Sequence, residues 1–160
     1  MRVFDASSMI HAWDSYPLEQ FPGLWQWIAQ QVAQQEIRLP VVAFEEVTHK
    51  TPECATWLRE QGHEATQIDN DALQEAARMK HLIGVIGDKY HPNGVDENDL
   101  LIIATAFLWG QELVSDEARQ PTIPQNLARQ KIPAVCALPT VKVNCVSFLE
   151  FIKQSGRIFR

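Results

Sequence analysis

The sequence has no excess of basic residues. Fourteen Lys and Arg stand against twenty Asp and Glu among its 160 residues, which gives a formal net charge of −6. This charge excludes a protein that binds nucleic acid simply by being basic. It leaves a local contact with phosphate open, because a metal ion held by carboxylates reverses the sign of the electrostatic field where it sits.

The sequence also lacks paired cysteines and long apolar runs. Its three cysteines are odd in number and none has C-x-x-C spacing, so we predict neither a disulfide framework nor a zinc signature. This cysteine usage fits a reducing cytoplasm. The longest apolar run, residues 100–109, is too short to span a bilayer, and Asp5 stands where a signal peptide would be apolar. We expect a cytoplasmic protein with no membrane partner.

Short apolar segments typical of strands alternate with amphipathic segments typical of helices. Apolar residues make up 46% of the chain, which is enough for a globular core, and no repeat or linker divides it. The alternation predicts one α/β domain over residues 1–160, with a short central parallel sheet and helices on both faces. The expected strands are 2–4, 37–40, 112–115 and 141–145; the expected helices lie within 17–35 (with a break at 22–23), 41–50, 55–61, 71–86, 96–108 and 148–154, with 122–130 as helix or loop.

Acidic residues gather near the carboxyl ends of the expected strands, where a parallel sheet forms its functional crevice. Like charges close together raise each other's pKa, so such a cluster needs compensation. Hard divalent cations supply it, and Mg²⁺ or Mn²⁺ suit carboxylate ligands best. A site of this kind supports hydrolysis of a phosphate ester. Four segments contribute: Asp5, Glu45 with Glu46, Asp96 with Asp99, and Asp116 with Glu117.

Each of these acids also has a purely structural interpretation. Asp96 and Asp99 are spaced as the N-cap and N3 residues of a helix, where the helix dipole favours acids. The acids at 45–46 suit a solvated first turn, and those at 116–117 suit a loop. Asp5 is the hardest to explain structurally, because it directly follows a buried apolar strand and precedes two small hydroxyl residues.

The four segments, in this order, resemble the motifs of the PIN domain, the nuclease fold used by many bacterial toxins of toxin–antitoxin pairs. Residues 3–10 (VFDASSMI) resemble its opening strand, acid and following hydroxyl. In residues 40–47 (PVVAFEEV) the acid precedes an aliphatic residue, and residues 99–106 (DLLIIATA) carry an acid, an apolar run and Ala-Thr-Ala. Residues 113–117 (LVSDE) resemble its final Val-Thr-x-Asp.

The tail of the chain, residues 131–151, resembles a PIN-like subfamily long known only as a domain of unknown function. The likeness therefore extends from residue 3 to about 152. The sequence departs from the PIN motifs at two places. Glu117 stands where the family usually has Asp, with Asp116 beside it as a competing candidate. Asp96 is an additional acid one turn before Asp99.

The resemblance implies a metal-dependent endoribonuclease, a hydrolase of RNA phosphodiester bonds that is the toxin of a two-gene toxin–antitoxin module. Its cofactor would be Mg²⁺ or Mn²⁺, and its partners an RNA substrate, a cognate antitoxin protein and a second copy of the chain. The implied site comprises Asp5, Glu46, Asp99 and Glu117 as catalytic metal-holding residues, Asp96 and Asp116 as further candidate ligands, Ser7 and Ser115 orienting a ligand or water, and His49 and Lys50, on the helical face of Glu46, as contacts to nucleic acid.

Two other functions compete with this one. A haloacid-dehalogenase-type phosphatase would share the acidic loop of residues 94–99, but it needs an acid where Ser7 stands and a strand where residues 90–93 form a turn. The other is a degenerate PIN-like binding module that has lost catalysis. No position of the acid set has been lost to a neutral residue, which weighs against that module.

Overall fold

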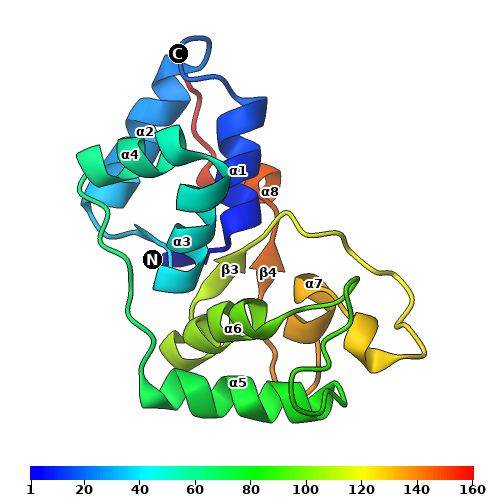
Figure 1. Ribbon diagram of the computed structural model, residues 1–160. Helices are drawn as coiled ribbons and strands as arrows, with labels where there is room; N and C mark the ends of the chain where they lie inside the picture. The colour runs from blue at the N-terminus through cyan, green and yellow to red at the C-terminus, as the bar shows by residue number, and fades with distance from the viewer.

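Four short parallel strands lie between two groups of helices (Figure 1) in the computed structural model, which describes all 160 residues. Their order across the sheet is β2-β1-β3-β4, and every neighbouring pair is parallel. The predicted α/β class with a parallel sheet is therefore confirmed. The strands are β1 (Arg2–Phe4), β2 (Ile37–Arg38), β3 (Glu112–Val114) and β4 (Cys145–Val146).

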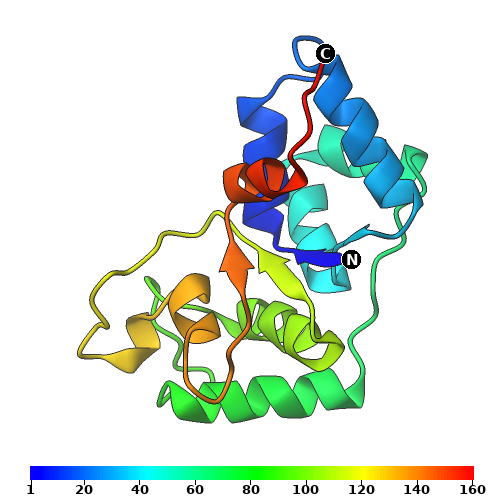
Figure 2. The ribbon, with the colours of Figure 1, turned by 180° about the vertical axis from the view of Figure 1, so that it is seen from behind.

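Helices cover both faces of this sheet, as predicted. Helices α5, α6 and α7 lie on one side, whereas α1 to α4 and α8 lie on the other, and both views show this separation (Figures 1 and 2). None of the helices is long and apolar enough to cross a membrane. The helices are α1 (Ala6–Ser15), α2 (Pro22–Ala33), α3 (Val41–Lys50), α4 (Pro52–Glu60), α5 (Asn70–Leu82), α6 (Glu97–Trp109), α7 (Ile132–Cys136) and α8 (Phe148–Ser155), with a 3₁₀ turn at Leu127–Arg129.

The core forms where the sheet meets α6 on one face and α8 on the other. Residues 100–106 of α6 are all buried, which confirms the predicted deep position of this apolar helix. On the opposite face, Phe4 of β1 meets Phe148 and Phe151 of α8 edge-on, with ring centroids 6.4 and 5.2 Å apart. Both faces of β1 are thus buried, so its carboxyl end has a fixed place in the fold.

Two helices, α1 and α7, were not predicted from the sequence. Helix α1 begins directly after Asp5 with Ser7 and Ser8, and serine is a weak helix former. It is stabilised by tertiary contacts instead, because Met9 is fully buried and the Ser8 hydroxyl donates to the Val114 carbonyl oxygen at 2.9 Å. Helix α7 has only five residues, too few for a periodic pattern.

Several expected boundaries were wrong. The segment 17–35 is interrupted after a turn at residues 18–20, as predicted, but the main helix α2 begins at Pro22 rather than near residue 24, because the first position of a helix suits proline. Helix α5 ends at Leu82 rather than at residue 86, because Gly84 adopts a left-handed φ of 71°. Strand β4 begins only at Cys145, because residues 141–144 turn back against α7 and the Val143 N–H donates to a carbonyl of that helix, 3.0 Å away.

A close backbone contact joins two loops that carry candidate site residues. Gly94 precedes α6 and lies against the 3₁₀ turn, so that a Cβ atom on it would stand 1.8 Å from the Ala128 carbonyl oxygen. The neighbouring Val95 N–H donates to the Gln130 carbonyl oxygen at 2.9 Å. The loop before Asp99 is thereby braced against the loop after Glu117.

Substitution of Gly94→Ala tests this brace. The added methyl group must push the two backbones apart, which we expect to cost about 1–3 kcal/mol of unfolding free energy, as overpacking does. Thermal denaturation should show a melting temperature lower by roughly 2–4 °C for each kcal/mol lost. The control is Asn93→Ala, a substitution at the exposed neighbouring residue. Equal melting temperatures for the two variants would contradict the close contact.

Candidate functional site

The carboxylate of Asp5 is buried at the end of β1. Its side chain is 2% exposed, and its backbone N–H donates to the Val114 carbonyl oxygen of the neighbouring strand at 2.9 Å. Two hydroxyl groups donate to the same carboxylate oxygen, Oδ2: Ser7 Oγ at 2.6 Å and Ser115 Oγ at 3.0 Å. The orientation of the carboxylate is therefore set from the start of α1 and from the residue that follows β3.

The same two hydroxyls also hold the segment that follows β3. Ser7 Oγ accepts the backbone N–H of Asp116 at 3.0 Å, and Ser115 Oγ accepts that of Glu117 at 3.2 Å. The hydroxyl oxygens themselves lie 3.3 Å apart. Ser7 and Ser115 thus lie directly against Asp5, and their hydroxyls hold the backbone of the next two acids.

A polar cavity of about 320 Å³ opens beside Asp5. Helix α3 contributes Glu46, which is partly exposed and forms an ion pair with Lys50 at 2.6 Å, whereas Glu45 is exposed and does not line the cavity. Of the two glutamates of α3, the cavity therefore takes the one that the motif selected. The lining residues are Asp5, Ser7, Ile10, His11, Glu46, Lys50, Asp116 and Glu117.

The acids around the cavity act on one another electrostatically. Burial raises the pKa of Asp5 to about 6; hydrogen bonds from Ser7 and Ser115 oppose the shift, and the negative charges of Glu46 and Glu117 add to it. The Asp5 carboxylate therefore lies within the electrostatic field of two other acids at this edge of the sheet.

Asp99 lies outside the lining of the cavity but within its electrostatic field. Burial raises the pKa of Asp99 to about 8, with the charges of Asp96, Asp5 and Glu117 adding to the shift. Asp99 Oδ2 accepts the Asp96 N–H and Asp96 Oδ1 accepts the Asp99 N–H, both at 2.9 Å. This capping box confirms the N-cap and N3 interpretation of the pair, and it engages one oxygen of each carboxylate.

The adjacent acids Asp116 and Glu117 have different surroundings. Asp116 Oδ1 accepts the Phe148 N–H at the start of α8, 3.4 Å away, and its Oδ2 is buried without a partner. Glu117 instead acts on Asp5 and Asp99, and its carboxylate lies 3.9 Å from Lys131 Nζ. Both side chains line the cavity, but only Asp116 also reaches a helix N-terminus.

Sequence analysis did not identify two basic residues near the cavity, His11 and Lys131. His49, which it did name, lies outside the cavity. His11 lines the cavity, and it follows Ser7 by four residues on one face of α1, a spacing that would have revealed it had α1 been predicted. Lys131 reaches Glu117 from a distant part of the chain, which no local pattern could show. His49 is exposed at the end of α3 and does not line the cavity.

The carboxylate oxygens that line this cavity are of the donor type that suits a hard divalent cation. No three Asp, Glu, His or Cys side chains are gathered closely enough to hold a metal ion as they stand. The site nevertheless brings oxygen donors from four segments of the chain to one edge, and burial, with the charges of neighbouring acids adding to it, raises the pKa values of Asp5 and Asp99. Carboxylate oxygens are the ligands that Mg²⁺ and Mn²⁺ prefer.

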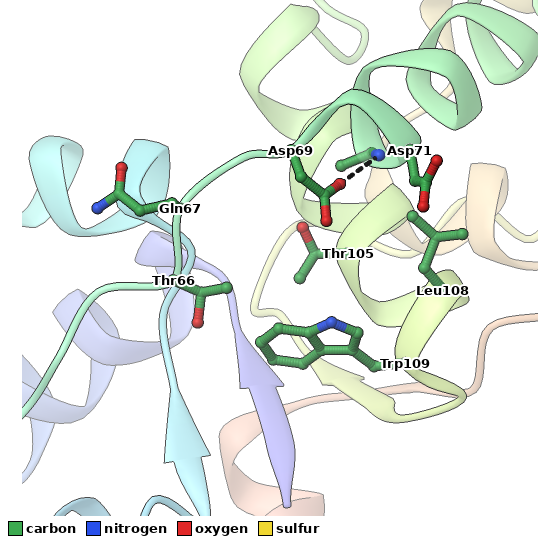
Figure 3. A pocket seen from close by; sticks show the side chains of 8 residues that line it. Thr66, Gln67, Asp69, Asp71, Thr105, Leu108 and Trp109 are labelled. Atoms are coloured by element: carbon green, nitrogen blue, oxygen red, sulfur yellow. Dashed lines mark hydrogen bonds between the residues drawn. The ribbon is translucent and has the colours of Figure 1, made fainter.

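A second cavity of similar volume, about 320 Å³, lies between the start of α5 and the end of α6 (Figure 3). Its acids have a structural explanation, because Asp69 accepts the Ala72 N–H at 2.9 Å as the N-cap of α5 and Asp71 lies in the first turn. The Thr105 hydroxyl donates to its own helix. We therefore place the candidate site at the cavity beside Asp5.

Comparisons with known proteins place the chain in a described family and fold. The model of a family described as a domain of unknown function (DUF4411) matches residues 3–159. The crystal structure of VapBC2 from Rickettsia felis bound to a DNA fragment from their promoter contains a chain with 14% identity and a TM-score of 0.52, covering 91% of this chain and 97% of that one. The crystal structure of FitAcB from Neisseria gonorrhoeae contains a chain with 12% identity and a TM-score of 0.49, and the match covers 93% of this chain and 99% of that one. No curated protein matches the sequence. The likeness to VapBC2 confirms the predicted PIN-like fold.

The raised pKa values predict how the metal-free protein responds to pH. Folded Asp5 and Asp99 keep their protons to about pH 6 and about pH 8, whereas the unfolded chain releases them near pH 4, so stability falls as pH rises through this window. The substitution Asp99→Asn removes the contribution of Asp99 to this pH-dependent loss of stability. In chelator, we expect its melting temperature to exceed that of the wild type by a margin that grows from about pH 4 to about pH 8.

The exposed acid Asp14 of α1 supplies the control for this experiment, because Asp14→Asn removes a carboxyl group that lies on the surface and outside the cavity. A margin for Asp99→Asn that stays constant with pH would show that Asp99 releases its proton normally in the folded protein.

Proposed function

The chain belongs to the family described as a domain of unknown function (DUF4411), as its motifs predicted, and from this premise we propose that it is a metal-dependent endoribonuclease. The observation that carries this proposal is the polar cavity at the carboxyl ends of the parallel strands, lined by Asp5, Glu46 and Glu117 with Asp99 close by. The fold shared with VapBC2 supports a toxin of a toxin–antitoxin module in the cytoplasm, with RNA as substrate, an antitoxin protein as partner and a second copy of the chain as a pairing partner.

Four carboxylates would hold Mg²⁺ or Mn²⁺ in this proposal: Asp5, Glu46, Asp99 and Glu117. When bound, the cation supplies Lewis-acid chemistry, which stabilises the charge that develops on phosphoryl oxygens and acidifies water. Asp96 and Asp116, also candidates from the sequence, stay outside the coordinating set in this proposal, because the resemblance to the PIN motifs selects Asp99 and Glu117 at these two places.

The other residues of the cavity orient these acids and neutralise their charge. Ser7 and Ser115 donate to one oxygen of Asp5 and leave its other oxygen for a ligand. Lys50 pairs with Glu46 and stands at the cavity, where its ammonium group would meet a phosphate of the RNA backbone. His49 remains a candidate contact further along the same helix.

One observation favours a second candidate function, a PIN-like module that binds a partner without catalysis. The acids are not gathered into a ready coordination set, and two of them, Glu46 and Glu117, already face lysines. A protein that had lost catalysis would keep such pairs as structural ion pairs. Cleavage of RNA separates the two functions.

Metal binding itself can be measured by thermal denaturation. A cation that binds only the folded state stabilises it by mass action, so millimolar Mn²⁺ should raise the melting temperature of the wild type. The rise should be much smaller for Asp5→Asn, which removes the central carboxylate, and unchanged for Asp14→Asn on the surface. Equal rises in all three proteins would rule out a shared site at Asp5.

Cleavage of a structured RNA by the purified protein tests the activity and the assignment of the fourth acid together. We expect cleavage with Mn²⁺, none in chelator, and a loss of at least about tenfold in Glu117→Gln, because it removes a ligand. Asp116→Asn should keep most of the activity, since that side chain faces α8.

Circular dichroism of both variants checks that they are folded. The opposite order of activities would move the site to Asp116. If the wild type binds Mn²⁺ and RNA yet leaves the RNA intact, the binding module is the correct function.

A further inference from the structure

Two of the three cysteines lie side by side where α7 turns back into β4. Cys136 is the last residue of α7 and Cys145 is the first residue of β4. The segment between them reverses direction through Lys142, whose φ is 50°, and the Val143 N–H donates to the Cys136 carbonyl oxygen at 3.0 Å. Helix α7 and strand β4 are in direct contact, and each of the two thiols shifts the pKa of the other.

The two cysteines differ in burial. Cys136 is 1% exposed, whereas Cys145 is only partly buried. Both are free thiols. The third cysteine, Cys54, is fully buried in α4, on the opposite face of the sheet from α7. Its separation makes it an internal control for any chemistry of the pair.

The surroundings of the pair favour Cys145 as the reactive thiol. The hydrogen bond from Cys136 lowers the pKa of Cys145, and the guanidinium group of Arg119, which also hydrogen-bonds its sulfur, lowers it further against the effect of burial. The pKa of Cys136 is raised by the same thiol contact and by burial. Burial raises the pKa of Cys54 to about 12.

We propose that Cys136 and Cys145 form a peroxide-sensitive dithiol that closes reversibly into an intramolecular disulfide. The Cys145 thiolate attacks one oxygen of hydrogen peroxide, the O–O bond breaks, and Cys145 sulfenic acid and hydroxide form. The Cys136 sulfur then attacks the sulfenic sulfur and displaces hydroxide, which takes up the Cys136 proton and leaves as water. Two thiols are oxidised by two electrons and one peroxide is reduced to water, and a dithiol reductant reverses the change.

A disulfide at this position would tie α7 to the edge strand of the sheet. Intracellular disulfides in most organisms are transient and serve redox sensing or catalysis, so a pair with one partly buried and one fully buried thiol suits a sensor. The proposal does not depend on the nuclease activity, because neither cysteine lines the acidic cavity.

Peptide mapping of the peroxide-treated wild type tests the proposal directly. Trypsin cuts after Lys142, between the two cysteines, so the disulfide would join the peptides 132–142 and 143–153. We expect hydrogen peroxide to remove two of the three free thiols, to produce this linked pair of peptides, and to leave Cys54 reduced. Dithiothreitol should restore all three thiols.

Single variants separate the roles of the two cysteines. Cys136→Ser should stop at the sulfenic acid, trapped on Cys145 by dimedone, whereas Cys145→Ser should leave Cys136 unmodified. Cys54→Ser is the matched control and should still form the disulfide. A wild type that keeps three thiols, a linked peptide that contains Cys54, or disulfides between molecules would overturn the proposal, and the wild-type map decides alone if a variant fails to fold.

Discussion

The buried carboxylate of Asp5 is the constraint on which the rest of the site depends. A charge taken out of water is costly unless hydrogen bonds compensate it, and here the compensation comes from Ser7 on one side and Ser115 on the other. Because the same hydroxyls also accept the N–H groups of Asp116 and Glu117, the carboxylate, the start of α1 and the end of β3 form one hydrogen-bonded unit. A change to any part of it would move the acids that follow.

Electrostatic repulsion links this unit to the neighbouring helices. Asp5 and Asp99 have raised pKa values because they are buried near other acids, and the lysines that face Glu46 and Glu117 neutralise only part of the charge. The metal-free fold therefore carries a strain that a cation would relieve. In this site stability and function are opposed, which is common where charged groups are arranged for chemistry.

Helix termini engage part of the acid set. Asp96 and Asp99 cap α6, and Asp116 faces the start of α8, so one oxygen of each of these carboxylates satisfies a backbone N–H group. Glu46 and Glu117 have no such role. Counting acids along the sequence cannot make this distinction, because capping depends on where each helix begins and which loop reaches it.

Features that depend on neighbouring residues could be predicted from the sequence. The apolar strand ending in Asp5 and the buried helix after Asp99 are local patterns of polarity and spacing, and each is present in the structure, whereas the choice of Glu46 as a site residue stays a prediction. Other features depend on contacts that form only in the folded protein. Helix α1 is stabilised by contacts with β3, Lys131 reaches Glu117 across a long loop, and the pairing of Cys136 with Cys145 needs the turn at Lys142. These features arise from contacts between distant segments, whose free energy no local pattern of residues records.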